Sequence, residues 1–157
     1  MNRYAAHTDV PAERSRAEIE RTLTRYGATQ FVYGWQEGAA VVAFALHGRQ
    51  VKFVLSLPSK ASRDFTYTPG RRHLRSPEQA RRAWEQATRQ RWRALALILK
   101  AKLEAVESGV TTFEDEFSPR FLLPDGQTVG QWLHPQLAQA YETRRMPPML
   151  PLPEPGA

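Results

Sequence analysis

Apolar side chains recur along the chain with a spacing that changes several times, and each spacing predicts a different element. In residues 15–26 they recur at helical spacing, behind a Ser-x-x-Glu capping box that begins at Ser15. This pattern predicts a first helix that begins at Pro11 or Ser15 and ends at Tyr26. The polar segment before it, residues 1–10, is expected to be flexible.

Three short segments with strand chemistry follow. Residues 29–35, 39–46 and 51–57 are rich in β-branched and aromatic side chains, and Gly38 and Gly48 mark turns between them. They predict an antiparallel three-stranded meander. The middle segment is apolar at almost every position, so we expect it to be the central strand and to be covered on both faces.

The longest helical pattern covers residues 77–107, between a capping box formed by Ser76 and Gln79 and a stop at Ser108-Gly109. This helix should be about 46 Å long at ~1.5 Å per residue. Large apolar side chains share one arc of its surface, and mostly small ones share the neighbouring arc. The large arc contains Trp84, Trp92, Leu95, Leu99, Leu103 and Val106, and the small arc contains Ala83, Ala87, Ala94, Leu97, Ala101 and Ala105. We expect the sheet to cover the large arc and another helix, or a second subunit, to cover the small one.

The pattern weakens towards the C-terminus. Residues 111–117 are expected to be irregular, and Thr128 begins a final helix in which Pro135 is predicted to cause a kink or a restart. The larger apolar side chains of this helix are expected to pack inward, namely Trp132, Leu137 and Tyr141.

The sequence therefore predicts an α+β fold in a single domain, residues 11–146, followed by a proline-rich tail, residues 147–157. An antiparallel meander of three to four strands is covered by an N-terminal helix and one long central helix, with a C-terminal helix after them. The fourth strand of this prediction is residues 64–68, at the edge of the sheet.

Basic residues are concentrated in one part of the chain. Residues 71–93 contain eight Arg against two Glu, a net charge of +6, and the whole chain also carries +6, so the remainder sums to zero. Arginine offers a planar fork of donors that pairs with phosphate or carboxylate. On the long helix a basic stripe recurs at spacings of 7, 4 and 7 residues, and it consists of Arg82, Arg89, Arg93 and Lys100.

This charge pattern predicts a nucleic-acid-binding surface, because phosphate backbones bind to such arginine clusters and bases stack on neighbouring aromatic rings. The predicted site comprises Arg71, Arg72, Arg75, Arg82, Arg89, Arg93, Lys100, Phe65 and Tyr67. Simpler interpretations stay open. The stripe can be a solvated helix face with pairs such as Arg81 with Glu85, and the two rings can cover the sheet edge.

Enzyme chemistry has little support in the sequence. The chain has no cysteine, and its histidines are too scattered for the usual zinc-binding spacings. Glu114, Asp115 and Glu116 are more simply an acidic loop than a magnesium site, and Asp64 could pair with one of them only if the fold brought them together. We therefore predict a non-enzymatic protein with no catalytic residue, no metal and no cofactor. The absence of cysteine, of a membrane-spanning run and of a signal segment favours a cytoplasmic protein with no membrane partner.

Two resemblances add to this picture. Residues 13–23, 89–95 and 100–105 resemble segments of small uncharacterised proteins encoded by bacteriophages and mobile elements, over most of residues 10–145. This resemblance implies handling of DNA, or binding and disabling of a host protein, in the host cytoplasm. The order of a helix, a three-stranded antiparallel meander and a long helix is similar to the core of single-strand annealing proteins. That resemblance implies assembly into rings or filaments, with DNA in a basic groove.

Two hypotheses follow from the sequence. The first is a phage-related, non-enzymatic protein that binds single-stranded DNA or RNA through its basic helix face and forms a homo-oligomer of the annealing type. The alternative is an interaction module or inhibitor whose arginines bind an acidic surface of a host protein.

Overall fold

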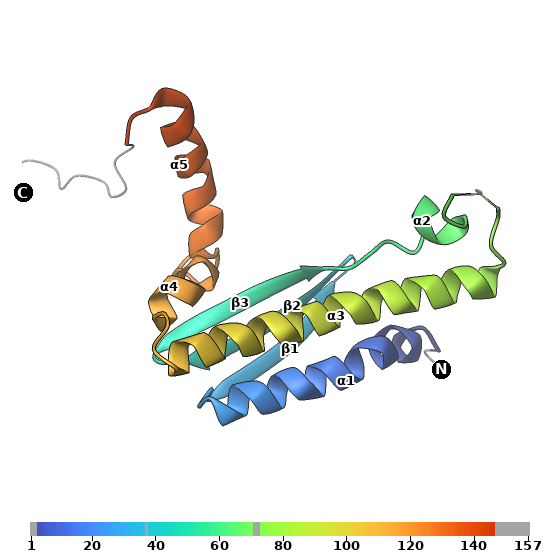
Figure 1. Ribbon diagram of the computed structural model, residues 1–157, viewed down its shortest axis with the longest axis horizontal. Coiled ribbons are helices and arrows are strands. Elements are labelled where there is room, and N and C mark those ends of the chain that lie inside the picture. Colours follow the sequence, from blue (N-terminus) through green and yellow to red (C-terminus); the bar gives the residue numbers. More distant parts are fainter. Residues whose placement is uncertain (1–2, 37, 71–72, 147–157) are drawn as a thin grey trace, which may run out of the picture.

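The computed structural model describes residues 3–36, 38–70 and 73–146, except for the side chains of residues 3–11. It confirms the predicted α+β fold, in which a three-stranded antiparallel meander is combined with an N-terminal helix, a long central helix and C-terminal helices (Figure 1). The elements, in chain order, are α1 (Arg3–Arg25), β1 (Gln30–Gln36), β2 (Ala39–Leu46), β3 (Arg49–Ser56), α2 (Arg63–Thr66), α3 (Pro77–Glu107), α4 (Phe113–Phe117), η1 (Ser118–Arg120) and α5 (Val129–Thr143).

The sheet has the order β1-β2-β3, with β2 in the centre as predicted. Pairing is antiparallel on both sides of β2: Tyr33 lies opposite Val42, and Val42 lies opposite Phe53. Since successive side chains point to opposite faces, one set of alternate residues faces the helices. On β2 that set is fully buried and consists of Ala40, Val42, Phe44 and Leu46.

The helices α1 and α3 lie side by side over one face of the sheet and run in the same direction (Figure 1). Ile19 and Leu23 of α1 and Trp92 and Leu99 of α3 are each no more than 1% exposed, and they join the inner side chains of β2 in one core. Burying a large apolar side chain contributes roughly 1.5–3 kcal/mol, so this two-layer contact is the main source of stability.

The other face of the sheet is open. Val32 of β1 is 59% exposed and Val54 of β3 is 43% exposed, and Val41 and Ala43 between them are half-buried. The prediction of a central strand covered on both faces was therefore wrong. The outer face of β2 carries alanine and valine, whose small side chains can face water at a modest cost, so an apolar run does not by itself show that the same chain covers both faces.

The long helix α3 has the predicted ends. The hydroxyl of Ser76 accepts a hydrogen bond from the backbone N–H of Gln79, and the side chain of Gln79 accepts one from the N–H of Ser76. Its large apolar arc is buried, apart from a partly exposed Val106, whereas the small arc is only partly covered and leaves Ala94 and Leu97 exposed. A second subunit on the small arc stays a prediction.

The predicted fourth strand at residues 64–68 was wrong, because its first half forms the single helical turn α2. The hydroxyl of Ser62 accepts a hydrogen bond from the backbone N–H of Asp64 and starts the turn. Such local capping competes with strand pairing. The backbone then extends, and Tyr67 pairs with Leu74 in an isolated bridge.

The segment expected to be irregular contains α4. Thr112 caps this helix by accepting a hydrogen bond from the N–H of Asp115, and acidic residues suit its first turn. Phe113 and Phe117 are buried, and Phe117 packs edge-on against Phe44, with 6.2 Å between the ring centroids. The expectation failed because the cap and the Phe pair at i,i+4 are a helix signature in a segment too short to show periodicity.

The C-terminal helix α5 begins after Thr128 as predicted, with a capping box that Thr128 and Gln131 form, and it continues through Pro135 without a restart. It stands away from the sheet as an arm (Figure 1). Leu137 is 42% and Tyr141 84% exposed, so the prediction that they pack inward was wrong, while Trp132 nearer the base is half-buried.

The N-terminal helix α1 starts at Arg3, whereas the sequence predicts a start at Pro11 or Ser15. A proline removes one helical hydrogen bond, and the hydrogen bonds before and after it can still carry the helix through, as α5 also illustrates at Pro135. Residues 147–157, which contain the predicted proline-rich tail, lie outside the described residues.

Candidate nucleic-acid interface

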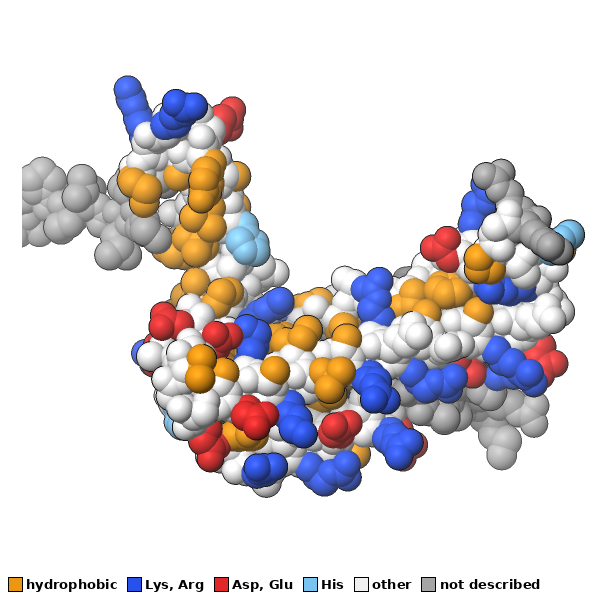
Figure 2. All heavy atoms as spheres, viewed as in Figure 1, with side chains coloured by type: hydrophobic (Ala, Val, Ile, Leu, Met, Phe, Trp, Pro, Cys, Tyr) orange, Lys and Arg blue, Asp and Glu red, His pale blue; other side chains and the backbone are white. Residues whose placement is uncertain are grey.

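The four basic residues of the predicted stripe are all exposed along α3, namely Arg82, Arg89, Arg93 and Lys100. Their spacing places them on one side of the helix. Figure 2 shows the Lys and Arg side chains following α1 and α3, with acidic side chains more frequent towards α4. The first half of α3, Pro77 to Arg93, carries five Arg and two Glu and so has a net charge of +3.

Not all of these arginines are equally available. Arg82 pairs with Glu78 at 2.9 Å, and its neighbour Arg81 pairs with Glu85 at 3.0 Å. These are surface pairs at i,i+4, the simpler interpretation of the stripe, and such pairs contribute little to stability. Within the part of the chain that the structure describes, Arg89 and Arg93 form no ion pair with a carboxylate.

Arg89 and Arg93 meet a third arginine, Arg14 of α1, at a surface hollow of about 390 Å³. The hollow lies between the two helices and is also lined by Ser15, Glu18, Ala96 and Leu97. Three guanidinium groups against one carboxylate give the site a net charge of +2. Like charges held close together repel, and a bound anion relieves that repulsion.

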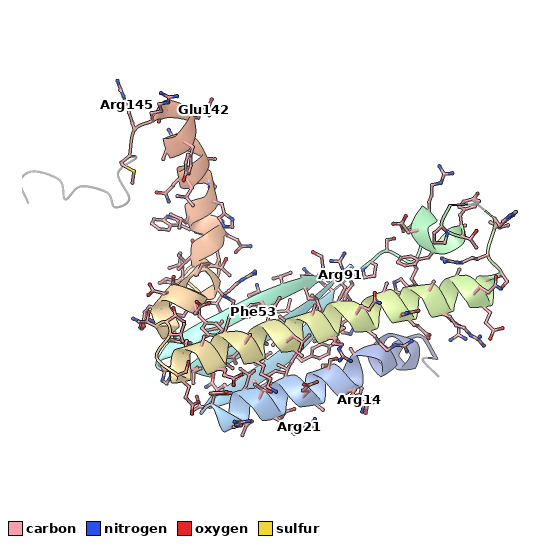
Figure 3. The ribbon with its side chains drawn as sticks, in the orientation of Figure 1. Arg14, Arg21, Phe53, Arg91, Glu142 and Arg145 are labelled. Atoms are coloured by element: carbon pink, nitrogen blue, oxygen red, sulfur yellow. The ribbon has the colours of Figure 1, made fainter. Side chains whose placement is uncertain are left out.

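Sequence reasoning missed the contribution of α1. Arg14, Arg21 and Arg25 follow one another at spacings of 7 and 4 residues, the same spacings as Arg82, Arg89 and Arg93. Arg14 and Arg21 extend from α1 away from the sheet (Figure 3). Since α1 and α3 run side by side, the two sets form two neighbouring basic rows. The repeated spacing was the sequence signal that could have indicated the row on α1, although not its position beside α3. We call this surface the double arginine row: Arg14, Arg21, Arg25, Arg89, Arg93 and Lys100.

The basic turn before α3 contributes less than predicted. Arg71 and Arg72 lie outside the described residues. Arg75 is described, and its Nη1 donates hydrogen bonds to the backbone oxygens of Asp64 at 2.8 Å and Phe65 at 3.3 Å. This guanidinium therefore holds the end of α2 in place, which reduces its availability for a phosphate.

The two predicted stacking rings differ. Phe65 is only 9% exposed, on an element that contacts α3, so it is not available to a base. Tyr67 is half-buried and lies with Arg63 and Asp64 at a second hollow of about 350 Å³, and the guanidinium of Arg63 is 5.3 Å from the centre of its ring. Tyr67 thus remains a candidate for stacking, whereas Phe65 belongs to the core.

Comparison with protein-family models, with curated proteins and with solved structures finds no match for this chain.

No group of three or more His, Asp or Glu in the part of the chain that the structure describes is placed to hold a metal ion. Asp64 and the acidic residues of α4 lie at opposite ends of α3 (Figure 1), so the fold does not bring them together. Among the described helices, none is long and apolar enough to cross a membrane.

Proposed function

We propose that this protein binds nucleic acid non-enzymatically, with the phosphate backbone lying along the double arginine row. The observation that carries the proposal is the meeting of Arg14, Arg89 and Arg93 at one hollow, with no carboxylate paired to them among the described residues. An arginine cluster of this kind matches the charge and the hydrogen-bonding geometry of phosphates.

Binding through phosphate contacts distinguishes poorly between nucleotide sequences. Phosphate contacts position a protein on nucleic acid, while base-edge contacts supply specificity. The double arginine row consists of side chains on the outside of two helices, and it offers charge along a line. The proposed binding is therefore largely independent of sequence and strongly dependent on salt.

A single strand is the proposed preference. Tyr67 offers one ring on which a base could stack, and the order of α1, the meander and α3 resembles the core of single-strand annealing proteins. Both considerations favour single-stranded DNA or RNA over a duplex, and parallel titrations with the two forms test the preference.

The decisive experiment compares two double variants of the same helix. Arg89→Ala with Arg93→Ala removes two guanidinium groups that have no carboxylate partner in the described chain, whereas Arg81→Ala with Arg82→Ala removes two that are paired with Glu85 and Glu78. Both variants lose two charges. Fluorescence anisotropy with a labelled oligonucleotide should give a Kd at least about tenfold weaker for the first variant, and a change within about threefold for the second.

A salt series on the same samples tests the mechanism. The slope of log Kd against log salt should be shallower for the Arg89 and Arg93 variant, by roughly 0.7 for each lost contact to a single strand. Equal weakening by both double variants would mean that only total charge matters. A flat salt dependence of the unmodified protein would rule out phosphate contact.

A second candidate function has one specific observation in its favour. Leu97 lines the hollow and is 55% exposed, and an apolar side chain beside arginines suits an acidic protein surface as well as a phosphate chain. No oligonucleotide binding at low salt, together with a stoichiometric protein partner captured from nuclease-treated lysate, would favour an interaction module.

A further inference from the structure

Two apolar surfaces of this protein have no partner within the described chain, and the first is the arm α5. Its apolar side chains form a stripe at helical spacing: Val129, Trp132, Leu133, Leu137, Ala140 and Tyr141. Residues 128–141 contain no Asp, Glu, Lys or Arg, although 24% of the whole chain is charged. The stripe is packed only near its base, and Tyr141 at the far end is 84% exposed. An amphipathic helix normally turns such a stripe towards another surface.

The second surface is the open face of the sheet. Its outward residues are Gln30, Val32, Gly34 and Gln36 of β1, Ala39, Val41, Ala43 and Ala45 of β2, and Gln50, Lys52, Val54 and Ser56 of β3. Lys52 is the only charged side chain among them. Depletion of charge with an apolar centre is typical of the buried core of a protein interface.

The apolar stripe of α5 and the open sheet face match in length and in shape. The 15 residues of α5 make a helix about 22 Å long at ~1.5 Å per residue. The eight residues of β2 make a strand about 27 Å long at ~3.4 Å per residue. Gly34 and Ala43 keep the middle of the sheet face low, so that a helix carrying Leu137 and Tyr141 can lie on it.

We propose that the protein forms a two-fold dimer in which α5 of each copy lies on the open sheet face of the other. Each chain carries both the apolar stripe of α5 and the open sheet face. When two copies exchange their arms, both surfaces of both copies are covered, as a closed two-fold interface requires. In this structure α5 stands away from its own sheet, so a second copy supplies the occupant (Figure 1).

The area of such an exchange is sufficient for a dimer that dissociates on dilution. The part of α5 beyond its packed base, residues 132–143, is about 18 Å long and 10–12 Å wide, and it covers roughly 200 Å² of each surface that it joins. Four such surfaces give roughly 800 Å², the size of a weak, transient interface. This contact uses neither the small arc of α3 nor the double arginine row, so its test is independent of the proposed nucleic-acid binding.

The first test is the molar mass of the full chain by light scattering over a range of concentrations, with each variant checked for folding by circular dichroism. The mass should rise from 17.9 kDa to twice that value. Leu137→Glu and Val54→Lys change exposed residues, and each should weaken dimerisation at least about tenfold by placing a charge in an apolar contact. Val110→Glu, in the loop after α3, is the matched control and should leave the dimer intact, since Val110 is 81% exposed.

Cross-linking then identifies the contact. The chain has no cysteine, so each cysteine variant carries a single thiol that can react. In a mixture of Leu137→Cys chains and Val54→Cys chains, a short bismaleimide should link unlike chains. Cross-links formed only between Leu137→Cys chains would mean that arms pack on arms. Loss of the dimer on Ala101→Glu, at an exposed position of the small arc, but not on Leu137→Glu would place the interface on the small arc of α3. Either result, or a monomer at every concentration, would overturn the exchange.

Discussion

At the scale of single residues, what matters is which charges already have a partner. Arg81 and Arg82 bind carboxylates one turn away, and Arg75 binds backbone oxygens. Arg89 and Arg93, in the same helix, do not bind a carboxylate in the described chain. A net charge counted along the sequence gives these residues equal weight, whereas the paired ones offer a ligand less.

The pair of Lys102 and Glu116 gives a prediction about pH. The ammonium group of Lys102 donates a hydrogen bond to Oε2 of Glu116 at 2.8 Å, and this bond, with the charge of Lys102, lowers the pKa of the Glu116 carboxyl. A carboxyl whose pKa is lower in the folded protein binds fewer protons there than in the unfolded chain. The pair therefore stabilises the fold at neutral pH, and this contribution is lost as pH falls through the lowered pKa.

Lys102→Met should raise the pKa of Glu116 towards that of an ordinary glutamate, which a carboxyl NMR titration measures directly. The stability difference between the two proteins should be present at neutral pH and shrink in acid. Lys100→Met, which removes a lysine from the same helix, should leave the pKa of Glu116 unchanged. An unshifted Glu116 in the Lys102 variant would show that the hydrogen bond does not form in solution.

At the scale of elements, the direction of α5 depends on one glycine. A Cβ added to Gly130 would lie 2.9 Å from the backbone oxygen of Pro119, closer than real contacts of this kind. We expect Gly130→Ala to destabilise the protein by about 1 kcal/mol, because overpacking against η1 costs about 1–3 kcal/mol and the higher helix propensity of alanine returns about 1.

Thermal unfolding at low protein concentration measures this effect, and about 1 kcal/mol corresponds to a fall in Tm of roughly 2–4 °C for a chain of this size. Gly34→Ala is the control, since its added Cβ meets nothing within 4 Å and should not lower Tm. A higher Tm for Gly130→Ala would mean that the base of the arm is not held by this close approach.

Elements with long or strong patterns were predictable from the sequence, and those decided by contacts were not. The ends of α3 follow from Ser76 and Gln79, and β2 was placed at its correct residues by its apolar run. The single turn α2 depends on a cap at Ser62 that looks like any loop serine. The inward-facing prediction for Tyr141 failed because helical periodicity identifies an apolar stripe but does not say whether the same chain covers it.

The part of the candidate site that lies on one helix was predictable from the sequence, and the part that depends on packing was not. The exposed stripe of α3 follows from charge spacing, because one helix fixes the relative positions of Arg89 and Arg93. That Arg14 lies beside them depends on the packing of α1 against α3, which no single-sequence pattern specifies. Phe65 shows the opposite error, since a ring beside arginines in the sequence is part of the core in the fold.

At the scale of the whole molecule, the two proposed surfaces lie on opposite layers. The double arginine row is on the helix layer, and the open face is on the other side of the sheet. In a dimer formed through the open faces, the double arginine row of one copy and that of the other copy would therefore point outward on opposite sides. A long nucleic-acid strand could contact the double arginine rows of both copies, whereas a short strand could contact that of only one copy.

This arrangement predicts that dimerisation matters for long nucleic acid and not for short. Leu137→Glu, which is designed to separate the copies, should leave the Kd for a short oligonucleotide unchanged and weaken binding of a strand long enough to reach both rows by at least about tenfold, because linked binding events raise avidity. Anisotropy titrations with a 12-mer and a 60-mer on the same protein samples measure the contrast, and Val110→Glu should behave like the unmodified protein with both. Equal weakening with both lengths would mean that the arm itself contacts nucleic acid, and no weakening with either would mean that a single row holds the long strand alone.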